Sequence, residues 1–255
     1  RDHRKIVFGE LQDHEGRIQI YFEKDKFCGA QSELLSLLDL GDILGVKGAV
    51  FQTRRGEVTI NVEDYTLLTK TLLPLPEKWK GIQNPELKYR RRSEYVATNP
   101  EVKEVFVKRS KGISAMREFL DAKGFLEVET PLLQPVYGGA SACPFKTHVR
   151  VLGTDHFLSI SPELYLKRYI AAGFNRVYTI CKNFRNEGID RIHNPEFTMM
   201  ECYATYWDYN DMMKLVEDIF VYVCNKINGT TKVKFRGKEI DFKKPWKKMT
   251  MAQAI

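Results

Sequence analysis

The chain has 255 residues, which is long enough for two domains of ordinary size that each bury a core. Its composition, 43% hydrophobic and 29% charged, is that of a globular protein, and the lack of a run of about 18 apolar residues excludes a membrane-spanning helix. A net charge of +7 suits an anionic partner such as nucleic acid, although it is also ordinary surface charge.

Residues 1–69 alternate between polar and apolar side chains in the manner of strands. The turn signals Glu15-Gly16 and Arg55-Gly56 separate strands, and Gln31–Leu40 predicts one short helix. Five strands and a helix are typical of a small barrel of the OB type, which commonly binds single-stranded nucleic acid on an aromatic and basic face. The expected strands are Lys5–Leu11, Arg17–Phe22, Ile43–Phe51, Glu57–Val62 and Tyr65–Leu68.

Two residues of the predicted barrel are candidates for contact with nucleic acid. On a binding face, Phe8 could stack on a base while Gln19 forms a hydrogen bond to one. The alternative is that Phe8 belongs to the core and Gln19 is a solvent-facing strand residue. The pattern of the strands leaves both alternatives open.

Residues 70–98 predict a linker. The segment has three prolines and little periodicity, and it contains a basic run at Lys88–Arg92 that leads into a charged helix or loop. A basic run is usually a solvated face, and phosphate contact is the alternative that remains open.

Residues 99–255 predict a second domain that contains both helices and strands. Polar residues that can cap a helix and prolines at first helical positions mark where two of the helices begin. The expected elements are a helix from Asn99 to Gly124, a strand at Phe125–Val128, a helix from Ser161 to Gly173 and a helix at about Asp208–Lys226.

The cysteines predict neither a disulfide framework nor a metal site. The chain has five scattered cysteines, which form no CxxC pair and no cluster with zinc-ligand spacing. Reduced thiols and the lack of a recognisable secretory signal favour a cytoplasmic protein. No metal ligands are expected in this chain.

The stretch from Phe184 to Tyr203 predicts a hairpin that could hold a nucleotide. If Cys181–Glu187 and Phe197–Tyr203 are strands, the side-chain period of two puts Arg185 and Glu187 on one face. Arginine offers a planar fork of donors that matches phosphate or carboxylate. The segment between the two strands is then a basic loop.

The side chains of this hairpin could divide the parts of a nucleotide between them. Glu187 could accept a hydrogen bond from an exocyclic amine, Phe197 offers a stacking surface, and His193 with Arg191 could meet the outer phosphates. The alternative is an ion pair between Arg185 and Glu187, with Phe197 in the core.

A second constellation is acidic. The two carboxylates of Glu163 and Glu201, with the phenol of Tyr203, could hold a cationic small molecule whose ammonium group needs several acceptors. The alternative for Glu163 is helix electrostatics, because it lies in the first turn after Ser161, where a carboxylate is favourable.

Short motifs in the second domain carry a resemblance to a known family. Phe184–Glu187, followed by His193–Phe197 and Glu201, resembles motif 2 of the class II aminoacyl-tRNA synthetases. Gly124–Pro131 resembles motif 1 of that class, whose helix and strand build the dimer interface. The resemblance therefore implies a homodimer formed through the motif 1 region.

Three further segments resemble the lysine-specific branch, the lysyl-tRNA synthetases. They are Gly138–Ala142, Pro144-Phe145 and Ser161–Arg168. The aspartyl and asparaginyl enzymes share the barrel and motif 2, but the aspartyl branch typically has glutamine where this chain has Glu163. A related aspartyl- or asparaginyl-type synthetase is thus a less similar alternative.

The resemblance covers essentially the whole chain and implies an α+β fold. An N-terminal OB-fold β-barrel, which binds the anticodon, would occupy residues 1–69, and a linker would occupy residues 70–98. Residues 99–255 would form part of the catalytic domain, with motifs 1 and 2 on a class II synthetase-type antiparallel sheet flanked by helices. Phe8 and Gln19 fall where the barrel of the family meets the tRNA anticodon.

The resemblance also implies roles for the site residues. Arg185 would contact the ATP α-phosphate and the substrate carboxylate, Glu187 and Phe197 would hold the adenine, and His193 would lie near the terminal phosphates. The other residues would bind L-lysine: the Gly139 carbonyl and Glu163 at its α-amino group, and Glu201 and Tyr203 at its side chain.

The implied reaction is the ATP-dependent ligation of L-lysine to tRNA(Lys) through a lysyl-adenylate, with Mg²⁺ bridging the phosphates. Motif 3 and the acidic magnesium ligands of the class are not recognisable after Asp241, so we expect a truncated fragment that is inactive alone. A non-catalytic tRNA-binding module is the alternative. A paralogue that attaches lysine to a protein is disfavoured, because such paralogues resemble catalytic domains without the barrel.

Overall fold

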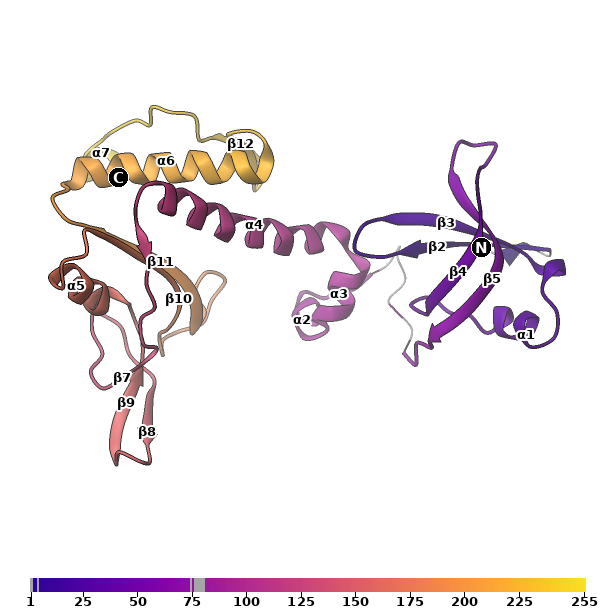
Figure 1. Ribbon diagram of the computed structural model, residues 1–255, viewed down its shortest axis with the longest axis horizontal. Helices are drawn as coiled ribbons and strands as arrows, with labels where there is room; N and C mark the ends of the chain where they lie inside the picture. Colours follow the sequence, from indigo (N-terminus) through magenta and orange to yellow (C-terminus); the bar gives the residue numbers. More distant parts are fainter. Residues whose placement is uncertain (1, 4, 74, 76–80) are drawn as a thin grey trace. The chain divides into compact units, whose positions relative to one another are not determined.

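The computed structural model describes residues 2–3, 5–73, 75 and 81–255. The chain divides into two compact units, Arg1–Lys103 and Glu104–Ile255, which are described separately (Figure 1). Both helices and strands occur, so the α+β prediction is confirmed. Within the described ranges, none of the helices is both long and apolar enough to cross a membrane.

The first unit contains a five-stranded sheet with the order β1-β2-β3-β5-β4. Neighbouring strands are antiparallel, except that β3 and β5 are parallel. Two short helices, η1 (Lys24–Lys26) and α1 (Ala30–Ser36), connect β3 to β4. The strands are β1 (Asp2–His3), β2 (Ile6–Gln12), β3 (Arg17–Glu23), β4 (Ile43–Gln52) and β5 (Val58–Thr69).

One prediction for the strands of this unit was wrong: Glu57–Val62 and Tyr65–Leu68 belong to a single strand, β5. Lys47 pairs with Asp64 but the next residue, Gly48, pairs with Val62, so one residue of β5 is left over at this register shift. Such a bulge interrupts the alternation of side chains, and the sequence pattern therefore resembles two strands with a break between them.

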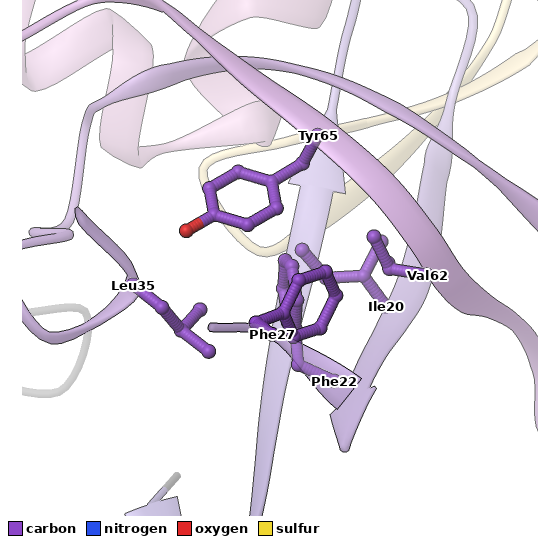
Figure 2. Close-up of a cluster of buried hydrophobic side chains, with 6 residues drawn as sticks. All are labelled: Ile20, Phe22, Phe27, Leu35, Val62 and Tyr65. Carbon is purple, nitrogen blue, oxygen red and sulfur yellow. The ribbon is translucent and has the colours of Figure 1, made fainter. Parts of the chain in front are cut away.

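The core of the first unit lies on one face of this sheet and is closed by α1. Phe22 is 1% exposed, and Tyr65 packs edge-on against Phe22 and Phe27 with ring centroids 5.3 and 5.4 Å apart. Each large apolar side chain that is fully buried contributes about 1.5–3 kcal/mol. Figure 2 shows the six buried residues of this cluster: Ile20, Phe22, Phe27, Leu35, Val62 and Tyr65.

The predicted linker contains two short helices, α2 (Pro85–Arg90) and α3 (Arg92–Thr98). The Asn84 side chain caps α2 by accepting a hydrogen bond of 2.8 Å from the Glu86 N–H. Two cations of the basic run are paired locally, since Arg90 and Arg91 contact Glu86 and Glu94 at 2.7 and 2.6 Å. The run therefore lies on helices and is partly neutralised.

The second unit is built around a three-stranded sheet with the order β11-β10-β6. β10 pairs with β11 in antiparallel register, whereas β6 adds in parallel on the other side. A second sheet has the order β7-β9-β8, and β12 and β13 form a hairpin. The strands are β6 (Leu126–Glu127), β7 (Leu133–Gln134), β8 (Lys146–Val149), β9 (Thr154–Leu158), β10 (Arg176–Phe184), β11 (Glu196–Ala204), β12 (Lys232–Phe235) and β13 (Lys238–Asp241).

Helices cover both faces of the β10–β11 pair. On one face, the fully buried Tyr178 packs with Phe119 and Ile219 from α4 and α6. On the other face, the fully buried Val177 packs with Leu166 from α5. Alternate residues of each strand thus face α5, and Glu201 and Tyr203 of β11 share a strand face. The helices are α4 (Pro100–Ala122), α5 (Glu163–Ala171), α6 (Tyr209–Asn228) and α7 (Met251–Ala254).

The prediction that Arg185 and Glu187 lie on a strand was wrong. β10 runs from Arg176 to Phe184 and ends before both residues. Pro195, opposite Arg185, accepts a hydrogen bond from the Arg185 N–H but has no N–H to give in return. The next N–H, that of Asn186, donates to Cys143 instead. The chain therefore leaves β11 at this point.

Candidate active site

A single hydroxyl group ties the start of α5 to the middle of β11. The Ser161 Oγ donates a hydrogen bond of 2.9 Å to the Glu201 carboxylate and accepts one of 3.1 Å from the Glu163 N–H. The other oxygen of Glu201 accepts a hydrogen bond from the Tyr203 hydroxyl at 3.3 Å. Because Ser161 is only 3% exposed, these contacts form a shielded polar chain.

The local sequence explains the position of Glu163. It is the first residue of α5, where free N–H groups and the helix dipole favour a carboxylate. Its Oε1 also lies 2.6 Å from the Lys167 Nζ, one turn further along the helix. The helix-electrostatics alternative therefore describes part of what Glu163 does, but the same residue also borders the Glu201 cluster.

The turn at Gly138-Gly139, which we call the glycine turn, packs its backbone directly against this cluster. Gly139 has φ +88°, and a Cβ at this residue would lie 2.8 Å from the Glu163 Cβ and 3.0 Å from the Ser161 Oγ. At Gly138, a Cβ would lie 2.8 Å from the Leu164 Cδ1. Only glycine fits at Gly139, because both the space and the backbone conformation exclude a side chain.

The cluster is acidic, and its charge acts on the neighbouring phenol. Burial raises the pKa of Tyr203, and the negative charges of Glu201 and Glu163 raise it further. Tyr203 is therefore a neutral hydrogen-bond donor to a carboxylate in the physiological range. Two carboxylates and one phenol provide several acceptors for a cationic group.

Arg185 lies beside this cluster but makes different contacts. Its Nε and Nη2 both lie 3.4 Å from the carbonyl oxygen of Ile160, the residue before Ser161. Its guanidinium carbon lies 5.2 Å from the centroid of the Phe197 ring. In the described part of the chain Arg185 forms no ion pair with Glu187, and Phe197 is half-buried outside the core clusters. The alternative of an ion pair between Arg185 and Glu187, with Phe197 in the core, is thus wrong.

Glu187 holds a neighbouring loop. Its Oε1 accepts a hydrogen bond of 3.0 Å from the Cys143 N–H, and the Asn186 N–H donates to the Cys143 carbonyl at 2.8 Å. One carboxylate oxygen therefore fixes the side chain while the other has no partner of its own among these contacts. The sequence gives no local signal for this contact, since the two residues are 44 positions apart.

The loop that carries His193 is organised by Asp190, a residue that the sequence analysis missed. Asp190 accepts hydrogen bonds from the N–H groups of Ile192 and His193 at 2.7 and 2.8 Å, and it contacts the His193 Nδ1 at 2.7 Å. The hydrogen bond with His193 and the backbone donors lower the Asp190 pKa to about 2. The signal was available, because aspartate commonly bonds to the backbone two residues on.

The candidate residues of the first unit lie on the sheet face opposite its core. Val7 and Leu11 of β2 pack against the core, so Phe8 points away from it and contacts Tyr21 at a centroid distance of 5.1 Å. Tyr21 in turn contacts Phe51 at 6.0 Å. The core alternative for Phe8 is therefore wrong, and the sequence analysis missed Tyr21 and Phe51. We call these three residues the aromatic strip.

Gln19 belongs to the same face as the aromatic strip. Its Oε1 accepts a hydrogen bond of 2.8 Å from the Thr59 hydroxyl, so its amide group is oriented rather than freely solvated. Period-two alternation puts Gln19 and Tyr21 of β3 on one face, while Ile20 and Phe22 enter the core. That alternation was the signal that could have found Tyr21.

The structure thus gathers the candidates into three groups. Gly139, Glu163, Glu201 and Tyr203 meet around Ser161, and Arg185 with Phe197 adjoins them through Ile160. Glu187 and His193 form the second group, in the segment that follows Arg185, where Glu187 contacts Cys143 and His193 contacts Asp190. Phe8 and Gln19 form the third group, in the first unit. Across the described residues, no cluster of three or more His, Cys, Asp and Glu side chains could hold a metal ion.

Two family models match the chain. Residues 1–68 match the OB-fold nucleic acid binding domain, and residues 84–255 match the tRNA synthetases class II (D, K and N). The first range contains the aromatic strip with Gln19, and the second contains all the remaining candidate residues.

Curated proteins similar to this chain carry the name lysine–tRNA ligase. Those of Thermoanaerobacter sp. (strain X514) and Syntrophomonas wolfei subsp. wolfei are 52% identical over the whole chain, which spans 51% and 52% of their lengths. That of Clostridium perfringens (strain SM101 / Type A) is 51% identical over the whole chain and 51% of its own length. The chain spans about half the length of the curated relatives it matches.

Proposed function

The chain belongs to the class II tRNA synthetases (D, K and N), and on that premise we propose that it is part of a lysine–tRNA ligase, which activates L-lysine with ATP and transfers the lysyl group to tRNA(Lys). The observation that carries the proposal is the acidic cluster of Glu163, Glu201 and Tyr203 around Ser161, next to the Arg185 guanidinium. The acidic cluster provides acceptors for the two ammonium groups of a diamino acid, and Arg185 provides donors for a phosphate.

The acidic cluster would select the amino acid. Glu163 and the Gly139 carbonyl would receive the α-ammonium group, and Glu201 with the Tyr203 hydroxyl would receive the ε-ammonium group. An aspartate side chain would instead approach the Glu201 carboxylate and be repelled. This repulsion favours lysine over the aspartyl- or asparaginyl-type alternative.

Arg185 would bring the two reactants together. Its fork of donors can contact the lysine carboxylate and the ATP α-phosphate at the same time, which orients a carboxylate oxygen toward the α-phosphorus. That oxygen forms the new bond, the bond to the bridging oxygen of pyrophosphate breaks, and pyrophosphate leaves. The same guanidinium would stabilise the negative charge on the phosphorane-like transition state. A lysyl-adenylate results.

The remaining parts of ATP would meet the hairpin loops. The half-buried Phe197 would stack on adenine, the second oxygen of Glu187 would accept from its exocyclic amine, and His193 would lie near the terminal phosphates. Mg²⁺, when bound with ATP, would neutralise part of the charge of those phosphates. The carboxylates of the described residues do not gather into a metal site.

The first unit would bind the anticodon of tRNA(Lys). Its aromatic strip offers stacking surfaces for unpaired bases, and Gln19 offers an oriented amide. The proposed division is an anticodon-binding domain at residues 1–69, a linker at 70–98 and a catalytic domain from residue 99. The matched family ranges, residues 1–68 and 84–255, support the order of an OB-fold domain before a synthetase domain. The motif 1 segment, Gly124–Pro131, follows α4 and contains β6, and a homodimer would form through this region.

Binding and exchange measurements on the full-length protein test this function. Isothermal titration should show selective binding of L-lysine over L-aspartate, and Glu201→Gln should weaken lysine binding about 100-fold because a shielded charge-assisted contact is lost. Glu239→Gln, at an exposed ion pair on β13, is the matched control. Equal binding of the two amino acids would refute the proposal.

A second assay separates the ligase from a non-catalytic tRNA-binding module. The ligase should catalyse lysine-dependent exchange of pyrophosphate into ATP, and Arg185→Lys should slow this exchange strongly because lysine lacks the planar fork. A binding module would bind tRNA(Lys) through the aromatic strip and the basic run at Lys88–Arg92 and show no exchange. Both outcomes are measured on the same preparation.

A further inference from the structure

Glu163, the acceptor proposed for the α-ammonium group, is already paired with a cation of this chain. The Lys167 Nζ lies 2.6 Å from the Glu163 Oε1, at a spacing of four residues on α5. The Lys167 side chain is 57% exposed and that of Glu163 is 29% exposed. A largely solvated ammonium therefore contacts the carboxylate at which the α-ammonium group of the substrate is expected.

The two carboxylates of the cluster balance two cations, so a third cation would be in excess. Glu163 and Glu201 supply two negative charges, and both act on Tyr203. L-lysine would bring two ammonium groups, one for each carboxylate. Arg185 is directed to the Ile160 carbonyl and the Phe197 ring, so the ammonium of Lys167 is the surplus charge once the substrate is bound.

We propose that Lys167 is a resident counter-ion of the amino-acid site, which neutralises Glu163 when the site is empty and competes with the α-ammonium group of the incoming lysine. The inference rests on the proposed function and deepens it. Lys167 thereby sets the affinity for the substrate, and binding requires its ammonium to move away from Glu163.

The main effect of Lys167 is to compete with the α-ammonium group for Glu163, rather than to hold the Glu163 carboxylate in position. The backbone of Glu163 is held by its place in α5 and by the hydrogen bond from its N–H to Ser161, and its Cβ is wedged against Gly139. An exposed ion pair on a helix adds only a small stabilisation, because a long flexible side chain must be ordered to form it. Removal of the Lys167 charge should leave the carboxylate in place and open to a ligand.

The experiment compares Lys167→Met with Lys167→Arg in the full-length protein. Methionine keeps an unbranched side chain without the charge, and arginine keeps the charge. Isothermal titration should show that Lys167→Met binds L-lysine about fivefold more tightly than wild type, equivalent to about 1 kcal/mol, whereas Lys167→Arg stays close to wild type. The control is Lys108→Met, which removes a similar i,i+4 pair with Glu104 on α4 and should change nothing.

A ligand that lacks the α-amino group shows whether the gain in affinity of Lys167→Met depends on the contact of that group with Glu163. 6-Aminohexanoate carries the carboxylate and the terminal ammonium of lysine only, so its affinity, measured by competition, should be the same in Lys167→Met and wild type. ATP affinity should also be unchanged. An equal gain for both amines would mean a general electrostatic effect and would overturn the proposal, as would unchanged or weaker lysine binding in Lys167→Met.

Failure of this inference is distinguishable from failure of the proposed function. If wild type does not bind L-lysine, the proposed function itself is wrong, and the inference is wrong with it. If wild type binds L-lysine and Lys167→Met binds it no better, only the counter-ion role is wrong. Thermal unfolding of each variant shows whether the fold is intact, which the exposure of Lys167 leads us to expect.

Discussion

Gly139 approaches Glu163 so closely that no side chain fits between the two residues. A Cβ at Gly139 would lie 2.8 Å from the Glu163 Cβ, and the φ of +88° at Gly139 is unfavourable for any other residue. The glycine turn and the first turn of α5 therefore form one packed unit on the wall of the acidic cluster.

Gly139→Ala should weaken L-lysine binding by about tenfold or more, because the new methyl group must displace either the turn or Glu163. Gly153→Ala is the control, since Gly153 also has a positive φ, of +60°, but no heavy atom lies within 4 Å of its Cβ position. Titration calorimetry with both variants separates backbone strain from the clash at the site. Equal losses in the two variants would contradict the prediction.

Ser161→Ala should reduce both stability and substrate affinity. The substitution removes the donor to Glu201 and the acceptor for the Glu163 N–H, and the loss of such a contact typically costs about 1 kcal/mol in the free energy of unfolding. Lysine affinity should also fall, because Glu201 loses the bond that orients it. Ser36→Ala, at an exposed serine that donates to the Glu33 carbonyl, is the control for unfolding and binding.

Asp190 should give the His193 loop a pH dependence confined to strongly acidic solution. Its pKa in the folded protein is about 2, below the ordinary value of 3.8 for an aspartate, so its stabilising contacts are fully present above pH 3.8 and are lost as the pH falls through about 2. NMR titration of the Ile192 and His193 amides should show a midpoint near 2. The buried Val177 methyl groups report whether the fold is intact, and Asp190→Asn should abolish the titration. A midpoint near 4 in wild type would contradict the assignment.

The aromatic strip should contribute to the binding of an anticodon stem-loop. Base stacking on an aromatic side chain is worth about 1–3 kcal/mol, so Phe51→Leu should weaken the binding of a tRNA(Lys) anticodon stem-loop about tenfold. Phe51 is 39% exposed, so the substitution should leave the core intact. Phe235→Leu, on β12 of the second unit, is the matched control for fluorescence anisotropy. No difference between the two variants would contradict the prediction.

Much of the fold was predictable because its signals are local. Alternation of apolar residues predicted β2, β3 and β4, and the predicted helix at Asp208–Lys226 agrees with α6, whose capping box joins Asp208 and Asp211. The bulge in β5 and the end of β10 were not predictable, because each depends on a partner strand. At β10, the decisive partners are Pro195 and Cys143, which are distant in sequence.

The candidate site shows the same division between local and distant causes. The helix-start role of Ser161 follows from its position before Pro162, but its hydrogen bond to Glu201 joins residues 40 positions apart. Family motifs supplied the residues of the acidic cluster, whereas the geometry supplied Ser161 as their common neighbour. Lys167 lay inside a recognised motif, yet spacing alone could not show that its ammonium shares Glu163 with the site.

The contact between Glu187 and Cys143 has a practical consequence for experiments on this protein. Glu187 uses only the main-chain N–H of residue 143, and the Cys143 side chain is exposed. The thiol can therefore be replaced by serine or carry a small fluorescent probe without removing the hydrogen bond. Attached there, a probe would report when the loop beside Arg185 changes its surroundings.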